Sequence, residues 1–231
     1  GKITATLERQ TGSVDLALTL RRNGRRTVSL NHQSLRRQME FLGTLNAVQF
    51  SSLDLDLVRG GPEQRRNWLD TLLIQLEPFY AHILQQYNKI LRQRNALLKQ
   101  GSRGVEEQAS RGDLIVESQL ALWDAQLVTA GTRVIRRRAR ALKRLAPLAE
   151  FWHRAISGSK EVLEIKYAPN VPLEQDDPEL IKLAFFAKIQ QRGRLEQQHG
   201  TTLVAPTAMK LSFTSTKHPQ GSTVLKDSSE L

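Results

Sequence analysis

The residues with the greatest potential for chemistry are seven cations crowded into one run of twelve positions. No acidic residue lies between Ala125 and Ala149, so the charges of this run are not neutralised from within it. Either an acidic neighbour or a phosphate backbone must relieve their mutual repulsion. We favour a nucleic acid, and a solvated or partner-paired helix face stays open as the alternative. The run consists of Arg133, Arg136, Arg137, Arg138, Arg140, Lys143 and Arg144.

The overall charge favours the same kind of partner. The net charge of +11 and the isoelectric point near 10.3 indicate a polyanion, because Lys and Arg near phosphates displace condensed counterions. Long flexible cations without Asn or Gln forks position a backbone rather than read bases, so we expect DNA binding without sequence specificity. A basic surface with no dedicated partner is the alternative that composition leaves open.

Other chemistries find little support in the sequence. The chain has no cysteine, and its five histidines are scattered singly, which disfavours disulfides and metal sites. No nucleophile and base, and no paired carboxylates, stand out as a catalytic pair. No apolar run approaches the roughly 18 residues of a membrane helix, so we expect a cytoplasmic protein without a membrane partner.

A second block of interest runs from Phe50 to Asp70. Its pattern indicates a strand, a tight loop around Gly60-Gly61-Pro62, and then a helix that begins at the proline. From the residues alone, Arg65 and Arg66 are expected on the surface of the first helical turn, and Trp68 and Leu69 in the core.

The first fifty residues have a mixed pattern. Apolar and polar side chains alternate over Ile3–Leu7 and Val14–Leu20, which predicts half-buried strands. Asn23-Gly24 predicts a two-residue hairpin turn into another strand over Thr27–Leu30. We also expect a helix over Leu35–Leu42 with Gly43 as its C-cap, and a short strand over Ala47–Phe50.

Helical periodicity dominates the middle of the chain. After a break at Pro78, apolar residues recur at three and four positions up to about Gln100. A polar linker follows over Gly101–Gly112, and Asp113 is expected to cap a second long helix with apolar residues seven apart. The pattern predicts either an antiparallel helical hairpin or an ordinary amphipathic pair in a compact core.

The α+β character returns after the helices. Val162–Tyr167 alternates as a strand, and Leu180–Leu195 has the pattern of a further helix. This return suggests that the helices of residues 62–157 are inserted into one mixed domain.

The block from Phe50 to Asp70 resembles the signature of the RecF family. The matching residues are Phe50, Asp54, Leu55, Gly60, Pro62, Arg65, Arg66, Trp68, Leu69 and Asp70. Ser52-Leu53 departs from the family pattern, which usually has Pro-Glu there. Further blocks, including Leu91–Leu98 and Gly131–Arg138, extend the resemblance from Gly1 to about Val204.

The resemblance implies an α+β fold: part of an SMC/ABC-like ATPase head, built of antiparallel strands and helices, with an inserted long-helix hairpin domain. Residues 1–61 and 158–204 would belong to the ATPase lobe, and residues 62–157 to the helical domain. The family's ATP and Mg²⁺ need a phosphate loop, which there precedes the point where this sequence begins. No GxxxxGK[ST] is present, so we expect the central fragment alone neither to bind nor to hydrolyse ATP, and to hold no cofactor.

The resemblance also implies a function in DNA replication and recombinational repair. Its elements are ATP-dependent binding of DNA at single-strand gaps and single-strand/double-strand junctions, help in recombinase loading, and the SOS response. Mediator proteins of the RecO and RecR type and an ATP-dependent self-dimer are the implied partners. The alternative is a helical-hairpin adaptor that binds only protein.

Residues 205–231 depart from the family. With one permitted choice of codons, a reading one base earlier turns this segment into the family's own motifs, with a single G missing after Val204. We therefore interpret residues 205–231 as an out-of-frame, disordered tail that leaves an exposed sheet edge near Thr201–Val204. The competing interpretation is a divergent native strand over Lys210–Thr214.

Overall fold

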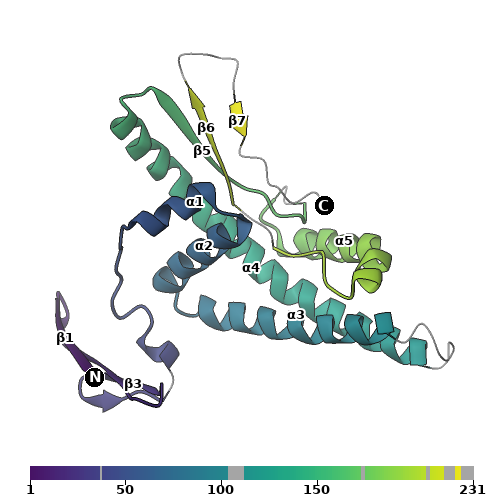
Figure 1. The fold of residues 1–231 in the computed structure, drawn as a ribbon, viewed down its shortest axis with the longest axis horizontal. Coiled ribbons are helices and arrows are strands. Elements are labelled where there is room, and N and C mark those ends of the chain that lie inside the picture. The colour runs from purple at the N-terminus through teal and green to yellow at the C-terminus, as the bar shows by residue number, and fades with distance from the viewer. Residues whose placement is uncertain (37, 104–111, 173–174, 207–208, 216–221, 225–231) are drawn as a thin grey trace. The chain divides into compact units, whose positions relative to one another are not determined.

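The fold is that of a computed structural model, which describes residues 1–36, 38–103, 112–172, 175–206, 209–215 and 222–224 (Figure 1). Internal contacts divide the chain into two compact units. The first comprises Gly1–Gln49 and Ile74–Ala81, and the second comprises Phe50–Leu73 and His82–Leu231.

The first unit contains an antiparallel meander. Its strands are β1 (Lys2–Arg9), β2 (Gly12–Leu20), β3 (Arg26–Leu30) and β4 (Gln33–Ser34), and they are adjacent in that order. Leu18 of β2 lies opposite Ile3 of β1 and Val28 of β3, so the predicted alternation sets the register.

The turn between β2 and β3 is longer than predicted. The Arg21 N–H donates to the Arg25 carbonyl at 3.0 Å, so three residues, and not two, form the loop. Gly24 has a φ of 77°, and the Asn23 side chain accepts a hydrogen bond from the Arg25 N–H. The Asn-Gly pair thus makes the turn through the positive φ that glycine tolerates.

Two expectations for the first unit are wrong. Only a short 3₁₀ helix, η1 (Gln38–Phe41), replaces the helix expected over Leu35–Leu42, and Ala47–Phe50 is not a strand. A Cβ on Gly43 would lie 2.5 Å from Pro78 Cγ, so tertiary packing decides the path here. The Ala47 N–H donates to the Gln75 side chain at 2.9 Å instead of to a neighbouring strand.

The second unit is mainly helical. It begins with η2 (Ser52–Leu55) and α1 (Asp56–Arg59), and most of α2 (Pro62–Leu76) follows. The long helices α3 (Tyr80–Arg103) and α4 (Gly112–Ser157) come next, and then β5 (Glu161–Tyr167), α5 (Pro178–His199), β6 (Met209–Ser215) and β7 (Ser222–Val224).

The expected antiparallel pair of long helices is present. Figure 1 shows α3 and α4 side by side, and the contacts give their direction: Arg94 pairs with Asp124, and the earlier Gln86 lies near the later Arg133. Ile83, Tyr87 and Ile90 of α3 are buried at the predicted helical spacing. The seven-residue repeat of α4 does not hold to its end, because Leu148 is 60% exposed whereas Leu127 and Val134 are buried.

The segment after Val204 is ordered where the structure describes it. β6 pairs antiparallel with β5 from Met209, opposite Tyr167, to Ser215, opposite Glu161, and β7 pairs with β6. The predicted disorder is therefore wrong for these two strands. The sequence of β6 alternates apolar and polar residues, which suits a strand partner for β5. Residues 207–208, 216–221 and 225–231 lie outside the described residues, and the frameshift stays a prediction.

The exposed sheet edge expected near Thr201–Val204 is also wrong. The Leu203 and Val204 N–H groups donate to the Glu196 carboxylate at 2.7 and 3.1 Å, and Val204 is buried. Thr202 donates to Asn95 of α3 through its backbone and its hydroxyl. Side chains of α3 and α5 thus satisfy these backbone groups.

Candidate nucleic-acid interface

Six of the seven clustered cations lie on one side of α4. At 100° per residue, they occupy an arc of about 120°, and Arg138 alone points to the opposite side. Four of the six are exposed and two are half-buried. We call this surface the cationic face; it consists of Arg133, Arg136, Arg137, Arg140, Lys143 and Arg144.

Arg138 is a correction to the predicted DNA contacts, because it is buried and fully engaged. Its guanidinium donates to both carboxylate oxygens of Asp70, at 2.8 and 2.7 Å, and to the Pro206 carbonyl at 2.6 Å. The nearby Tyr167 is half-buried with its hydroxyl inside, and burial raises the pKa of this phenol to about 12. Arg138 therefore joins α4 to α2 and to the segment before β6, and no phosphate reaches it.

Two arginines of the cationic face, Arg136 and Arg140, share one acidic partner. Arg136 Nε lies 2.6 Å from Asp176 Oδ1, and Arg140 Nε lies 2.5 Å from Asp176 Oδ2. The hydrogen bond from Arg136, together with that from Arg140, holds the pKa of the Asp176 carboxyl below its usual range. From the sequence, either an acidic neighbour or a phosphate backbone could neutralise the crowded cations. For Arg136 and Arg140 the structure shows an acidic neighbour, Asp176.

The remaining cations differ in their engagement. Arg133, Lys143 and Arg144 are exposed and form no ion pair with any residue in the described part of the chain. Arg137 is half-buried and has a partner. The three unpaired cations span three turns of α4, and their charge faces solvent.

Close helix packing holds the cationic face in place. A Cβ on Gly131 would lie 2.2 Å from Phe185 Cε1, so α5 approaches α4 at a position that only glycine fits. Two turns earlier on α4, Asp124 accepts a hydrogen bond from Arg94 of α3 at 2.6 Å, and Arg94 also donates to Glu196 of α5 at 2.7 Å. These buried contacts join the three helices.

The signature block has a structural role in the described contacts. The Ser51 N–H donates to the Asp54 carboxylate, and the Ser51 hydroxyl accepts from the Leu53 N–H, which caps η2. Arg65, expected on the surface, is buried and donates to the Gly60 carbonyl at 2.8 Å. Arg65 thereby braces the loop before α2.

The other signature residues divide between core and surface. Leu69 and Asp70 are buried, whereas Arg66 and Trp68 are half-buried. Phe50 is 88% exposed, and Leu55 is exposed as well. Among these signature residues, Asp70 contacts the arginine run through its hydrogen bonds with Arg138.

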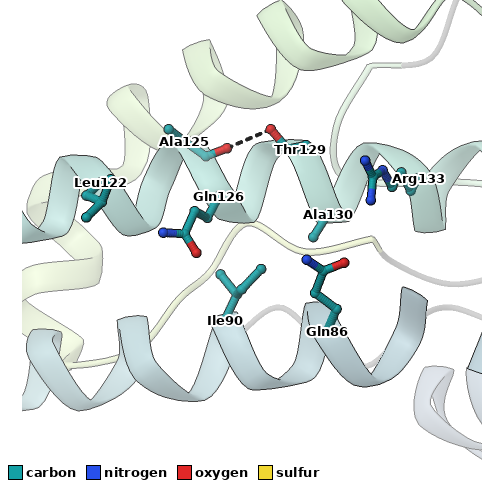
Figure 2. Close-up of a pocket in the computed structure, with 8 residues that line it drawn as sticks. All are labelled: Gln86, Ile90, Leu122, Ala125, Gln126, Thr129, Ala130 and Arg133. Carbon is teal, nitrogen blue, oxygen red and sulfur yellow. Dashed lines mark hydrogen bonds between the residues drawn. The ribbon is translucent and has the colours of Figure 1, made fainter. Parts of the chain in front are cut away.

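A groove between α3 and α4 adjoins the cationic face (Figure 2). Its volume is about 290 Å³, and Arg133 lies at one end while Gln86 and Gln126 carry amides into it. Sequence reasoning missed this groove and Asp176. The only signal for Asp176 was an acidic pair before Pro178, which reads as a helix cap. The groove is lined by Gln86, Ile90, Leu122, Ala125, Gln126, Thr129, Ala130 and Arg133.

Two other kinds of site, a metal centre and a membrane-spanning helix, have no candidate among the described residues. Among the described residues, no cluster of three or more His, Cys, Asp or Glu side chains is arranged to hold a metal ion. In the same part of the chain, no helix combines the length and apolar character that crossing a membrane requires.

Comparison with known proteins identifies the family. A curated protein of Nostoc punctiforme is 63% identical over 218 residues, which are 94% of this chain. One of Rippkaea orientalis is 59% identical over 215 residues, or 93% of the chain. Both are named DNA replication and repair protein RecF. The chain belongs to the RecF family. It spans 57% of the length of each of these two RecF proteins.

Solved structures agree with the assignment to RecF. One, described as the recombination mediator protein RecF-ATPrS in the RecFOR pathway, matches 99% of the chain with a TM-score of 0.83 at 23% identity, and 58% of its own length is covered. Another, described as RecF-ATP, matches 91% with a TM-score of 0.78 at 25% identity, and 54% of it is covered. These likenesses confirm the predicted α+β fold class. No family model matches the chain.

Proposed function

We propose that this chain is the part of a RecF-like DNA replication and repair protein that holds the phosphate backbone of DNA on the cationic face. The observation that carries the proposal is the set of three exposed cations, Arg133, Lys143 and Arg144, without an ionic partner in the described chain. Charge left unpaired on one helix face attracts a polyanion and releases its counterions on binding.

The finer functions follow from the family and stay proposals for the full-length protein. They are preference for single-strand gaps and single-strand/double-strand junctions, help in recombinase loading, and a part in the SOS response. ATP, Mg²⁺, a self-dimer and mediators of the RecO and RecR type would serve the same protein. The solved relatives described with ATP and within the RecFOR pathway support this proposal.

A protein-binding adaptor is the second candidate, and one observation favours it. The last turns of α4 expose large apolar side chains at helical spacing, namely Leu148, Phe151, Trp152 and Ile156. An exposed apolar stripe of this kind is typical of protein contacts. An adaptor of this type would bind DNA no more tightly than its net charge requires.

Charge removal tests the DNA-binding proposal. We would compare the wild-type chain with Arg133→Gln/Lys143→Gln/Arg144→Gln, since Gln keeps helix propensity. The matched control is Arg21→Gln/Arg22→Gln/Arg25→Gln, which removes the same charge from the exposed turn between β2 and β3. Fluorescence anisotropy with gapped duplex DNA over a series of salt concentrations measures affinity, and circular dichroism checks the helices.

The α4 variant should weaken binding about tenfold or more, and should reduce the slope of log K against log salt by about 0.9 per lost contact. The control should change both quantities much less. Equal losses in the two variants would show a general charge effect and would favour the adaptor.

A further inference from the structure

Asp176 neutralises two arginines with a single carboxylate. Each oxygen of Asp176 accepts a hydrogen bond from a different guanidinium, Arg136 through one and Arg140 through the other. The two arginines are four residues apart, so their side chains leave α4 one above the other. The acid comes from the residues just before α5, forty positions away from Arg136.

A phosphate group between Arg136 and Arg140 would accept hydrogen bonds from both guanidinium groups, as the Asp176 carboxylate does. A phosphodiester presents two anionic oxygens, as a carboxylate does, and guanidinium groups bind either through charge-assisted hydrogen bonds. The flanking members of the cationic face, Arg133 toward one end and Lys143 and Arg144 toward the other, continue the same line of charge. The Arg136–Arg140 pair therefore lies where a backbone following this face would pass.

Asp176 is free to leave without disrupting its surroundings. Its side chain is 44% exposed, and those of Arg136 and Arg140 are 27% and 59% exposed, so water screens the contact and keeps it weak. The α5 N-terminus does not depend on it, because the Asp177 side chain accepts the Glu179 and Leu180 N–H groups. Only the bridge to α4 is lost when Asp176 moves away.

We propose that Arg136 and Arg140 form a phosphate site that Asp176 occupies in the unbound protein and that a DNA phosphate takes over on binding. The part of this inference that concerns DNA rests on the proposed function, whereas the phosphate site itself does not. Asp176 then acts as an internal competitor that lowers affinity for weakly held polyanions.

The first experiment measures DNA affinity after removal of the competitor. Asp176→Asn keeps the shape of the side chain but removes its charge, and Glu179→Gln is the matched control. Glu179 is an exposed acid three residues away that pairs with Lys182 at 2.8 Å. Asp176→Asn should tighten binding of gapped DNA about threefold to tenfold at moderate salt, and the control should change it less than twofold.

A double-mutant cycle locates the effect. In the background Arg136→Gln/Arg140→Gln, Asp176→Asn should tighten DNA binding no more than Glu179→Gln does, because the guanidiniums that it would free are gone. The inference is overturned if Asp176→Asn and Glu179→Gln act alike in the wild-type background, or if the gain persists without the two arginines.

The second experiment uses pyrophosphate, without DNA. The ¹⁵Nε signals of Arg136 and Arg140 should shift saturably with pyrophosphate in Asp176→Asn, at a lower concentration than in the wild type. Saturable shifts together with unchanged DNA binding in the Arg133/Lys143/Arg144 variant would uphold the phosphate site and reject the proposed function. Absence of shifts at these two arginines in Asp176→Asn would overturn the phosphate site whatever the DNA result.

Discussion

Arginine residues of α3 and α4 serve two physical roles: the buried ones join helices through complete pairing, and exposed ones keep an unpaired charge in solvent. Arg94 is 1% exposed and is engaged by Asp124, Glu196 and the Thr202 hydroxyl, the last at 2.8 Å. Burial of this network raises the pKa of Asp124, although the hydrogen bond from Arg94 opposes the shift. A buried guanidinium needs such complete pairing because desolvation is costly. Arg133 and Arg144 keep their hydration and stay available to a ligand.

The buried pair of Arg138 and Asp70 should be essential to stability. Asp70→Ala removes the carboxylate that accepts two hydrogen bonds from the buried Arg138 guanidinium, so we expect a loss of about 3–5 kcal/mol in the free energy of unfolding. Urea denaturation followed by circular dichroism measures it. Arg144→Ala, at an exposed position, should stay within about 0.5 kcal/mol of wild type. A similar small change for Asp70→Ala would contradict the structural role of the pair.

At the scale of elements, α4 and α5 pack closely together because α4 has a glycine, Gly131, at their contact. Gly131 is in the interior of α4, where glycine costs helix stability, yet it faces the fully buried ring of Phe185. The cost in helix propensity is offset by the close approach of the two helices. This contact lies on the side of α4 away from the cationic face, and the hydrogen bonds from Arg136 and Arg140 place Asp176, just before α5, at that face.

Gly131→Ala should therefore destabilise the protein. The added methyl overlaps Phe185, and overpacking of this kind costs about 1–3 kcal/mol. Gly193→Ala in α5 is the control, because no atom lies within 4 Å of its added Cβ. That change should leave stability equal or raise it by up to about 1 kcal/mol. Thermal unfolding of the two variants gives the comparison, and equal effects would show that Gly131 is not a packing constraint.

The pairing of β6 with β5 makes a further prediction at this scale. Truncation after Val204 removes β6, and it also removes the Pro206 carbonyl that accepts from Arg138. We expect a clearly lower melting temperature and faster hydrogen exchange of the β5 amides, since an unpaired strand edge remains. Amides of β2, in the other unit, should exchange as before. Unchanged stability would instead support the interpretation of this segment as a dispensable tail.

At the scale of the whole molecule, attraction of polyanions depends on the total charge, whereas nucleotide binding depends on a local motif. The net charge of +11 belongs to the entire chain and draws polyanions to it. Phosphate-loop chemistry, in contrast, requires a local Gly-rich loop with a Lys and a Ser or Thr, and these 231 residues contain no GxxxxGK[ST]. Binding of DNA and binding of ATP are therefore expected to separate in this chain.

We expect no Mg²⁺-dependent binding of ATP that survives moderate salt, measured by isothermal titration calorimetry. Cations of α4 attract nucleotides only as they attract any anion, so weak heats should disappear as salt rises. Inorganic triphosphate is the control and should behave as ATP does. A micromolar, Mg²⁺-dependent affinity for ATP that survives moderate salt would contradict this prediction.

Local sequence patterns were sufficient for most elements. Alternation predicted β1, β2, β3 and β5, and helical spacing predicted α3, α4 and α5, because each pattern repeats within a few neighbouring residues. The short segments were less predictable: the helix expected over Leu35–Leu42 and the strand expected over Ala47–Phe50 depended on packing against Pro78 and Gln75.

The state of each arginine was decided only by the folded chain. In the sequence alone, Arg136, Arg138 and Arg140 cannot be told apart by residue type. A rotation of 100° per residue places Arg138 on the opposite side of the helix, but it does not say which side of the helix is buried. Their partners lie 36 to 68 residues away, at Asp176 and Asp70. Charge density could be read from sequence because it is a sum over neighbours, whereas pairing depends on which distant carboxylates the fold brings within hydrogen-bond distance.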